Sequence, residues 1–190
     1  MYLFFDAETS GLPRAWSAPP SDAGNWPRLV QIAWVACDAL GQQLRSQEYL
    51  IKPEGFKIAR EATQLHGITT DIALRDGVDL GPVLEEFSAA VRASRVLVAH
   101  NLDFDQRVVQ AELHRAQMAD AFARKKRICT MKETADYCQL PGKYGYKWPS
   151  LAELHRKLFG ASFVGAHGAL ADTEACMRCF FQLRKLEVFK

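Results

Sequence analysis

Hydrophobic and polar positions in the first part of the chain form short runs that are typical of strands. The first run, residues 2–5, is continuously apolar, as expected for a buried central strand. Two further runs, residues 29–37 and 43–51, lie on either side of a short turn at 38–41, and this order predicts an antiparallel hairpin. Four prolines interrupt residues 12–27, where we expect a long surface loop because proline breaks helices.

Helical periodicity dominates the chain after residue 58. Apolar positions recur at helical spacing in six segments: residues 59–66, 80–93, 104–117, 132–138, 151–159 and 169–186. A short buried strand is predicted at residues 95–99, between the second and third helices. Ser150 and Glu153 form a capping box before the fifth helix, and Gly160 ends it. A hairpin followed by alternating helices and strands predicts an α/β fold with a mixed central sheet and helices on its faces.

The composition fits one domain spanning residues 1–190, because 48% of the residues are hydrophobic and no shift in composition indicates a linker. The formal net charge of +2 requires no polyanionic partner, so a nucleic-acid surface would have to be local. The chain contains neither a membrane-length apolar run nor a signal-peptide pattern, from which we expect a cytoplasmic protein without a membrane partner. The oligomeric state is not specified by these features.

Cysteine spacing argues against both a disulfide framework and a zinc site. The five cysteines are an odd number and should be reduced. Cys176 and Cys179 resemble half of a zinc site, but Cys129 and Cys138 are poorly spaced to complete it. We expect Cys176 and Cys179 to line the buried stripe of the last helix.

Two carboxylates, Asp6 and Glu8, follow the first apolar run directly. Residues two apart in a strand project to the same side of the sheet. Two like charges held this close need a bound cation, or one of them is protonated. The alternative is an ordinary strand end before a Thr-Ser-Gly turn.

Candidate partners for this pair occur at two later positions. Residues 100–105 follow the strand at 95–99, and sites in such sheets form at strand ends. Asp103 and Asp105 are about 200° apart on a helix, so only one of them can face the first strand. His167 precedes Asp172 by five residues at the start of the last helix. Taken alone, that pair fits a loop histidine and an aspartate stabilised by the helix dipole equally well.

The motifs together resemble the DEDDh 3'-to-5' exonucleases, the DnaQ-like superfamily that includes the proofreading subunit of DNA polymerase III. The resemblance rests on four segments: Phe5-Asp6-Ala7-Glu8-Thr9-Ser10-Gly11-Leu12, Leu65-His66-Gly67-Ile68-Thr69, His100-Asn101-Leu102-Asp103-Phe104-Asp105 and His167-Gly168-Ala169-Leu170-Ala171-Asp172. It implies an RNase H-like fold with a mixed five-stranded sheet in a single exonuclease domain, 1–190. Ser10 and Asp103 depart from the usual family residues, and the loop at 12–27 is longer than in compact members.

The resemblance implies a metal-dependent hydrolase that releases nucleoside 5'-monophosphates from the 3' end of single-stranded or mismatched DNA, in DNA replication and repair. The implied catalytic residues are Asp6, Glu8, Asp105, His167 and Asp172. The four carboxylates among them would bind two divalent ions, Mg²⁺ or Mn²⁺. His167 would be the general base, because imidazole changes its charge near neutral pH.

The expected substrate-binding residues are those that lie in or beside the motifs: Ala7, Thr9, Leu12, His66, His100, Asn101 and Phe104. Leu12 would be an apolar wedge under a base and Phe104 a packing or stacking face. A structural role stays open for His66 and His100, whereas His114 and His155 are expected on helix surfaces. Two basic segments, residues 124–127 and 143–148, are further candidates for contact with nucleic acid or else packed or solvated connections.

Two other functions remain open at this point. One is a ribonuclease of the RNase T or oligoribonuclease type, for which the same five residues would serve. The other is a catalytically silent nucleic-acid-binding module, which the complete set of five residues disfavours. The chain ends soon after the last motif, so we expect no tethering tail, although a polymerase partner stays open. Fold and chemistry do not specify the preference for DNA or RNA.

Overall fold

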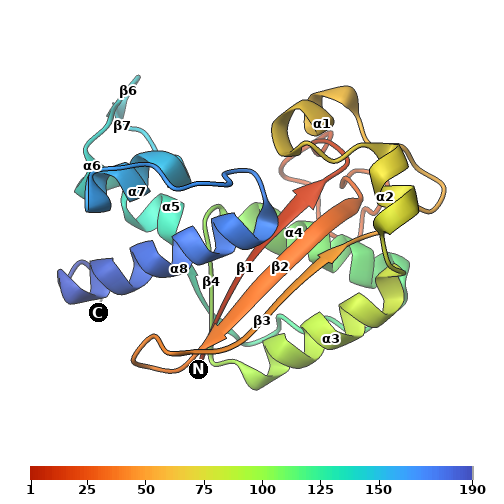
Figure 1. Ribbon diagram of the computed structural model, residues 1–190, viewed down its shortest axis with the longest axis horizontal. Helices are drawn as coiled ribbons and strands as arrows, with labels where there is room; N and C mark the ends of the chain where they lie inside the picture. Colours follow the sequence, from red (N-terminus) through yellow and green to blue (C-terminus); the bar gives the residue numbers. More distant parts are fainter. Residues whose placement is uncertain (190) are drawn as a thin grey trace.

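The computed structural model describes residues 1–189. Its centre is a five-stranded sheet with the order β3-β2-β1-β4-β5 (Figure 1). The strands are β1 (Tyr2–Thr9), β2 (Leu29–Cys37), β3 (Gln43–Leu50), β4 (Val96–Ala99) and β5 (Lys126–Cys129). β1 pairs antiparallel with β2 and parallel with β4, and β5 continues the parallel side. The predicted mixed sheet is therefore confirmed.

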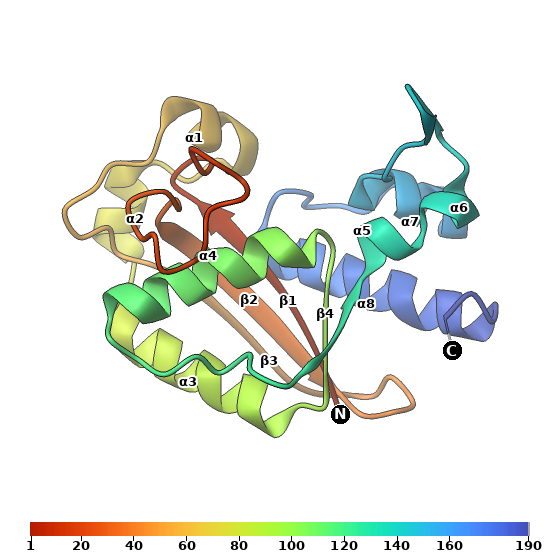
Figure 2. The same ribbon diagram turned by 180° about the vertical axis from the view of Figure 1, so that it is seen from behind.

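Helices cover both faces of this sheet (Figures 1 and 2). They are α1 (Arg60–His66), α2 (Thr70–Asp76), α3 (Leu80–Ala93), α4 (Leu102–Arg115), α5 (Thr130–Glu133), α6 (Ala135–Cys138), α7 (Leu151–Phe159) and α8 (Ala169–Lys185). Alternate residues of β1 enter two separate cores. Leu3 and Phe5 pack with α3 and α4, whereas Phe4 packs with α7 and α8. Because β1 alternates regularly, Asp6 and Glu8 point to the same side as Phe4, toward α8.

β1 is longer than its apolar run indicates. The strand continues to Thr9 because Asp6, Ala7 and Glu8 pair with Ala33, Ile32 and Gln31 of β2. This pairing uses backbone groups, so it does not need apolar side chains. The two carboxylates consequently belong to a rigid central strand, and the loop begins after them.

Three other local differences separate the structure from the expected elements. α2 was not predicted; it is short, and it is capped by the Thr69 side chain, which accepts from the N–H of Ile72 at 3.1 Å. The single helix expected at 132–138 is two four-residue helices that meet at Thr134. A small hairpin, β6 (Pro141–Gly142) and β7 (Gly145–Tyr146), follows them. Such short elements carry too few residues for a periodic signal.

The core also contains polar and sulfur-containing side chains. Cys176 and Cys179 are buried in the core on α8, as expected, and all five cysteines are free. The expectation of a surface position for His155 was wrong: its Nδ1 lies 2.7 Å from the carbonyl oxygen of Ala161, and its ring packs against Phe159. Across residues 1–189, no helix combines the length and the apolar character that a membrane span requires.

Candidate active site

Three carboxylates meet where the end of β1 lies against the first turn of α8. Asp6 and Glu8 come from β1, and Asp172 comes from α8. One oxygen from each of these three residues lies within 4.8 Å of the others. The chain thus places residues that are more than 160 positions apart in one compact cluster.

The electrostatics of the cluster are unfavourable without a cation. Burial raises the pKa of Asp6 well above its usual range, and the charges of three neighbouring carboxylates raise it further. Burial also raises the pKa of Glu8 to about 7, with a contribution from the charge of Asp172. Within residues 1–189, none of the carboxylates of this cluster has an ion-pair partner from the protein. A divalent cation would counteract these shifts, because its charge stabilises the ionised carboxylates.

The structure separates Asp105 from Asp103 on the first turn of α4. Asp105 is buried. Burial and the charge of Glu8 raise the pKa of Asp105, whereas the backbone N–H of Ala7 on β1 acts to lower the pKa of its carboxyl group. The side chain of Asp103 is 56% exposed and pairs with Lys132. Asp105 therefore lies beside the three-carboxylate cluster, and Asp103 belongs to the surface.

His167 lies in the exposed loop before α8, with a positive φ of 68°. Its backbone N–H faces the carboxylate of Asp172 at 3.3 Å and 3.4 Å from the two oxygens. Burial raises the pKa of Asp172, and this N–H and the imidazole of His167 act against the rise. The loop thus holds the imidazole at the edge of the carboxylate cluster.

A cavity of about 370 Å³ opens beside Glu8. Its lining includes most of the expected substrate-binding residues: Ala7, Thr9, Leu12, His66 and Phe104. Leu12 is 73% exposed, so this apolar side chain is free to meet a ligand. The cavity is large enough for one nucleotide and lies next to the carboxylates.

His66 closes one side of this cavity from the end of α1. Its Nε2 lies 3.2 Å from the carbonyl oxygen of Thr9, and its Nδ1 accepts from the N–H of Ile68 at 3.1 Å. Burial lowers the pKa of His66, and the nearby charge of His167 lowers it further. The residue is therefore held as a neutral wall of the cavity by bonds within the protein.

His100 is placed differently from the other expected contacts. Its Nδ1 lies 3.0 Å from Thr130 Oγ1, and its Nε2 lies 3.0 Å from the carbonyl oxygen of Pro149. Burial lowers the pKa of His100 to about 4. Since both ring nitrogens are bonded within the protein, the geometry favours the structural alternative for this residue. Asn101 follows it with a positive φ of 73° and begins α4.

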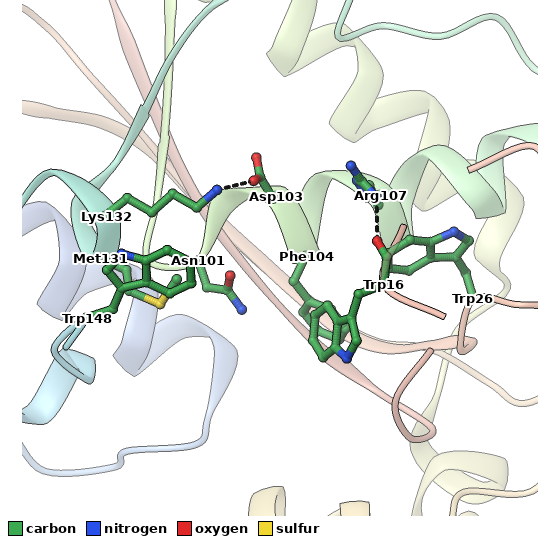
Figure 3. Close-up of a pocket in the computed structure, with 9 residues that line it drawn as sticks. All are labelled: Trp16, Trp26, Asn101, Asp103, Phe104, Arg107, Met131, Lys132 and Trp148. Atoms are coloured by element: carbon green, nitrogen blue, oxygen red, sulfur yellow. Dashed lines mark hydrogen bonds and ion pairs between the residues drawn. The ribbon is translucent and has the colours of Figure 1, made fainter. Parts of the chain in front are cut away.

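A second groove, of about 490 Å³, lies on the other side of Phe104 (Figure 3). Trp16, Trp148 and Arg107 belong to its lining. Sequence reasoning included Trp148 only as the last residue of the basic segment 143–148 and did not select Trp16 or Arg107. The only signal in the sequence was indirect: Trp16 lies in the long loop, and Trp148 closes one of the basic segments. The other basic segment is bound to the protein, since Lys125 and Arg127 donate to backbone carbonyls.

A comparison with protein families identifies the group to which this chain belongs. The family described as Exonuclease (RNase_T) matches residues 3–180, which include all of the motifs. The chain belongs to this exonuclease family. The resemblance to DEDDh 3'-to-5' exonucleases is confirmed at this level. None of the curated proteins matches this chain.

Solved structures of exonuclease I share the fold of this chain. One has a TM-score of 0.77 and 20% identity over 97% of this chain and 40% of that chain. The zinc-bound complex of E. coli exonuclease I with single-stranded DNA has a TM-score of 0.76 and 20% identity over 98% and 40% of the two chains. The complex of E. coli exonuclease I with a dA16 oligonucleotide has a TM-score of 0.76 and 18% identity over 97% of this chain and 40% of that chain. The chain spans about 40% of the length of these neighbours, and the likeness establishes the RNase H-like fold.

The carboxylate donors of this site suit hard divalent cations. Asp6, Glu8 and Asp172 offer carboxylate oxygens in one cluster, and Mg²⁺ and Mn²⁺ prefer such ligands. The raised pKa values of these groups are the second observation in favour of a cation, because a metal ion keeps carboxylates ionised. The residues present therefore fit a metal centre.

Proposed function

We propose that the protein is a metal-dependent 3'-to-5' exonuclease that removes nucleotides from the 3' end of single-stranded or mismatched DNA. The products are nucleoside 5'-monophosphates and a strand shortened by one nucleotide. The observation that carries the proposal is the partly buried cluster of Asp6, Glu8 and Asp172, with the buried Asp105 beside it and without a cationic partner among residues 1–189. Such a cluster is costly for stability, so its presence favours a functional role.

The four carboxylates Asp6, Glu8, Asp105 and Asp172 would hold two divalent ions, Mg²⁺ or Mn²⁺. When bound, such ions polarise a phosphodiester and make water a better nucleophile. Asp6 and Glu8 position the centre rigidly because they belong to the central strand. Asp172 couples the centre to the loop that carries His167 through its hydrogen bonds with the N–H of His167.

His167 acts as the general base in this proposal. Its imidazole takes the proton from the water that attacks the terminal phosphorus, and the bond from phosphorus to the 3' oxygen of the preceding nucleotide breaks. Its place in an exposed loop lets the proton pass to solvent afterwards. His66 does not compete for this role, because both of its ring nitrogens are bonded within the protein.

The cavity beside Glu8 binds the terminal nucleotide. Ala7 and Thr9 line the side formed by β1, and Leu12 and Phe104 supply apolar surface for the base. Apolar and stacking contacts do not distinguish bases strongly, which suits removal of successive nucleotides of any sequence. The solved complexes of E. coli exonuclease I with single-stranded DNA oligonucleotides support this choice of substrate class.

The test is hydrolysis of single-stranded oligonucleotides of DNA and of RNA, each labelled at the 5' end or at the 3' end. Reactions contain Mg²⁺, Mn²⁺ or EDTA, and products are resolved by length. We expect a ladder of shortened 5'-labelled DNA with either metal, early release of the 3' label as a mononucleotide, and no products in EDTA. Faster hydrolysis of RNA would favour the ribonuclease instead.

The matched control is a pair of aspartates on one helix turn. Asp105→Asn should abolish the ladder, whereas Asp103→Asn should retain it, because Asp103 is exposed and pairs only with Lys132. If a folded protein leaves both substrates intact under every metal condition, this result would exclude both the deoxyribonuclease and the ribonuclease activity.

A further inference from the structure

The groove beyond Phe104 is lined by exposed aromatic rings that the proposed chemistry does not use. Trp16 is 55% exposed and Trp148 is 57% exposed, and both belong to its lining (Figure 3). Phe104 lines this groove and also the cavity for the terminal nucleotide. The groove and the cavity beside Glu8 therefore adjoin at Phe104.

Trp16 is held in place, although it lies in a long loop. Arg107 on α4 donates to the carbonyl oxygen of Trp16 at 2.7 Å, and Asn25 is hydrogen-bonded to both backbone groups of Ala15. The ring of Trp16 lies 5.6 Å from that of Phe104, with an angle of 44° between the planes. These contacts fix an exposed aromatic face beside Phe104 before any ligand binds.

Trp148 forms the opposite wall from a different part of the chain. It precedes Pro149, whose carbonyl oxygen is bonded to the partly buried His100. The ammonium group of Lys132 lies 5.5 Å from the centre of the Trp148 ring, within the range of a cation–π contact. The structural role of His100 thus has a consequence for the groove, since His100 anchors the segment that carries Trp148.

The charges along the groove suit a polyanion. Arg107 and Lys132 supply two cations, and Asp103, which pairs with Lys132, supplies one carboxylate. The net charge of the groove lining is positive, whereas the net charge of the whole protein is close to zero. Cationic side chains alternating with aromatic rings are the common arrangement in proteins that bind single strands without sequence preference.

We propose that this groove binds the unpaired bases that precede the terminal nucleotide of the substrate strand. Trp16 and Trp148 stack on these bases, and Arg107 and Lys132 contact the phosphates between them. The inference rests on the proposed exonuclease function and assigns the residues that would give it a preference for unpaired ends. In a duplex, only the last base pair has a free face, so the two tryptophans favour a 3' end with several unpaired nucleotides.

The experiment compares two substrates that differ in whether they reach the groove. One is a single-stranded oligonucleotide of deoxythymidines, and the other is the p-nitrophenyl ester of thymidine 5'-monophosphate, which has no preceding base. Trp16→Ala and Trp148→Ala should lower the ratio of kcat/KM for the oligonucleotide to kcat/KM for the ester by about fivefold or more each, mainly through KM. Trp148→Phe should recover most of the loss because it keeps an aromatic face.

Leu40→Ala is the matched control, because Leu40 is 92% exposed in the turn between β2 and β3, outside both cavities. It should leave the ratio unchanged. Binding of a fluorescently labelled oligonucleotide in EDTA should weaken in the two alanine variants by a similar factor, and this readout does not need catalysis.

Each outcome bears on one of the two proposals. An unchanged ratio and unchanged binding in both alanine variants would overturn the groove proposal, and hydrolysis of the ester would still support the exonuclease. Equal losses on both substrates would also overturn it, since the tryptophans would then act on the catalytic site or the fold. Tryptophan-dependent binding without hydrolysis of either substrate would support the groove and refute the exonuclease.

Discussion

Replacing Glu8 with glutamine should make the metal-free protein more stable while it destroys the metal centre. Burial and the charge of Asp172 raise the pKa of Glu8 from 4.5 to about 7. The folded state therefore binds the proton of Glu8 more tightly than the unfolded state does. The stability contributed by this group is fully present below pH 4.5 and is lost as the pH rises through 7.

The magnitude follows from the difference between the two pKa values. One unit is worth about 1.4 kcal/mol, so ionised Glu8 costs the folded protein about 3 kcal/mol at pH 8. Glu8→Gln removes this cost and should raise the midpoint of thermal unfolding by about 6–12 °C, since 1 kcal/mol corresponds to about 2–4 °C in a domain of this size. At pH 4.5 the two proteins should be equally stable, because Glu8 is then largely protonated in the native protein.

The assay is thermal unfolding in EDTA at both pH values, followed by circular dichroism. Glu85→Gln, on the exposed face of α3, is the matched control and should change neither midpoint appreciably. Mn²⁺ should reverse the order at pH 8, because the wild type gains the free energy of metal binding and the variant lacks a ligand. A Glu8→Gln protein that is less stable than the wild type at pH 8 in EDTA would refute the electrostatic reasoning.

Three further predictions concern other residues of the site and of its support. Asp105→Asn should abolish turnover, whereas Asp103→Asn should retain it. The rate at which mononucleotides are released measures both variants. Loss of turnover in Asp103→Asn alone would show that Asp103, and not Asp105, is the fourth ligand. His167→Ala should lose most turnover yet keep the thermal stabilisation by Mn²⁺, and near-wild-type turnover would contradict its role as the base. Glu112→Leu should lower the free energy of unfolding by about 3–5 kcal/mol, because it leaves the guanidinium of Arg28 and a backbone N–H without their buried acceptor; an unchanged urea midpoint would contradict this.

Local signals were sufficient for the main elements of this chain. Periodicity predicts α3 at residues 80–93 and β2 at residues 29–37 with the bounds that the structure has. These segments are long enough to repeat their pattern several times. α2 and the divided helix at 130–138 are too short for such repetition, and their caps depend on single side chains such as Thr69.

Spacing also determined part of the site. The separation of two residues places Asp6 and Glu8 on one face of β1, because side chains alternate along any strand. Spacing alone did not determine whether Asp103 or Asp105 faces that strand. The family motif was needed to select Asp105. The structure places Asp105 there because α4 begins directly after β4, the parallel neighbour of β1.

Only the tertiary structure decided which polar residues are buried. Glu112 lies on a helix whose polar positions suggest a solvent-exposed face, yet it is 1% exposed and accepts from the N–H of Leu29 and from Arg28. His155 is similarly buried among aromatic rings. Burial depends on which elements pack together, and the periodicity of one helix does not contain that information.

By itself, the sequence determined the type of each long element, the shared face of Asp6 and Glu8, and the family to which the motifs belong. Tertiary structure decided that Asp172 meets these two carboxylates and that Trp16 and Trp148 form two walls of one groove. The physical reason is the distance along the chain. Strand and helix patterns arise from neighbours a few residues apart, whereas these side chains meet only after α4, α8 and the loop at 10–28 have packed around the sheet.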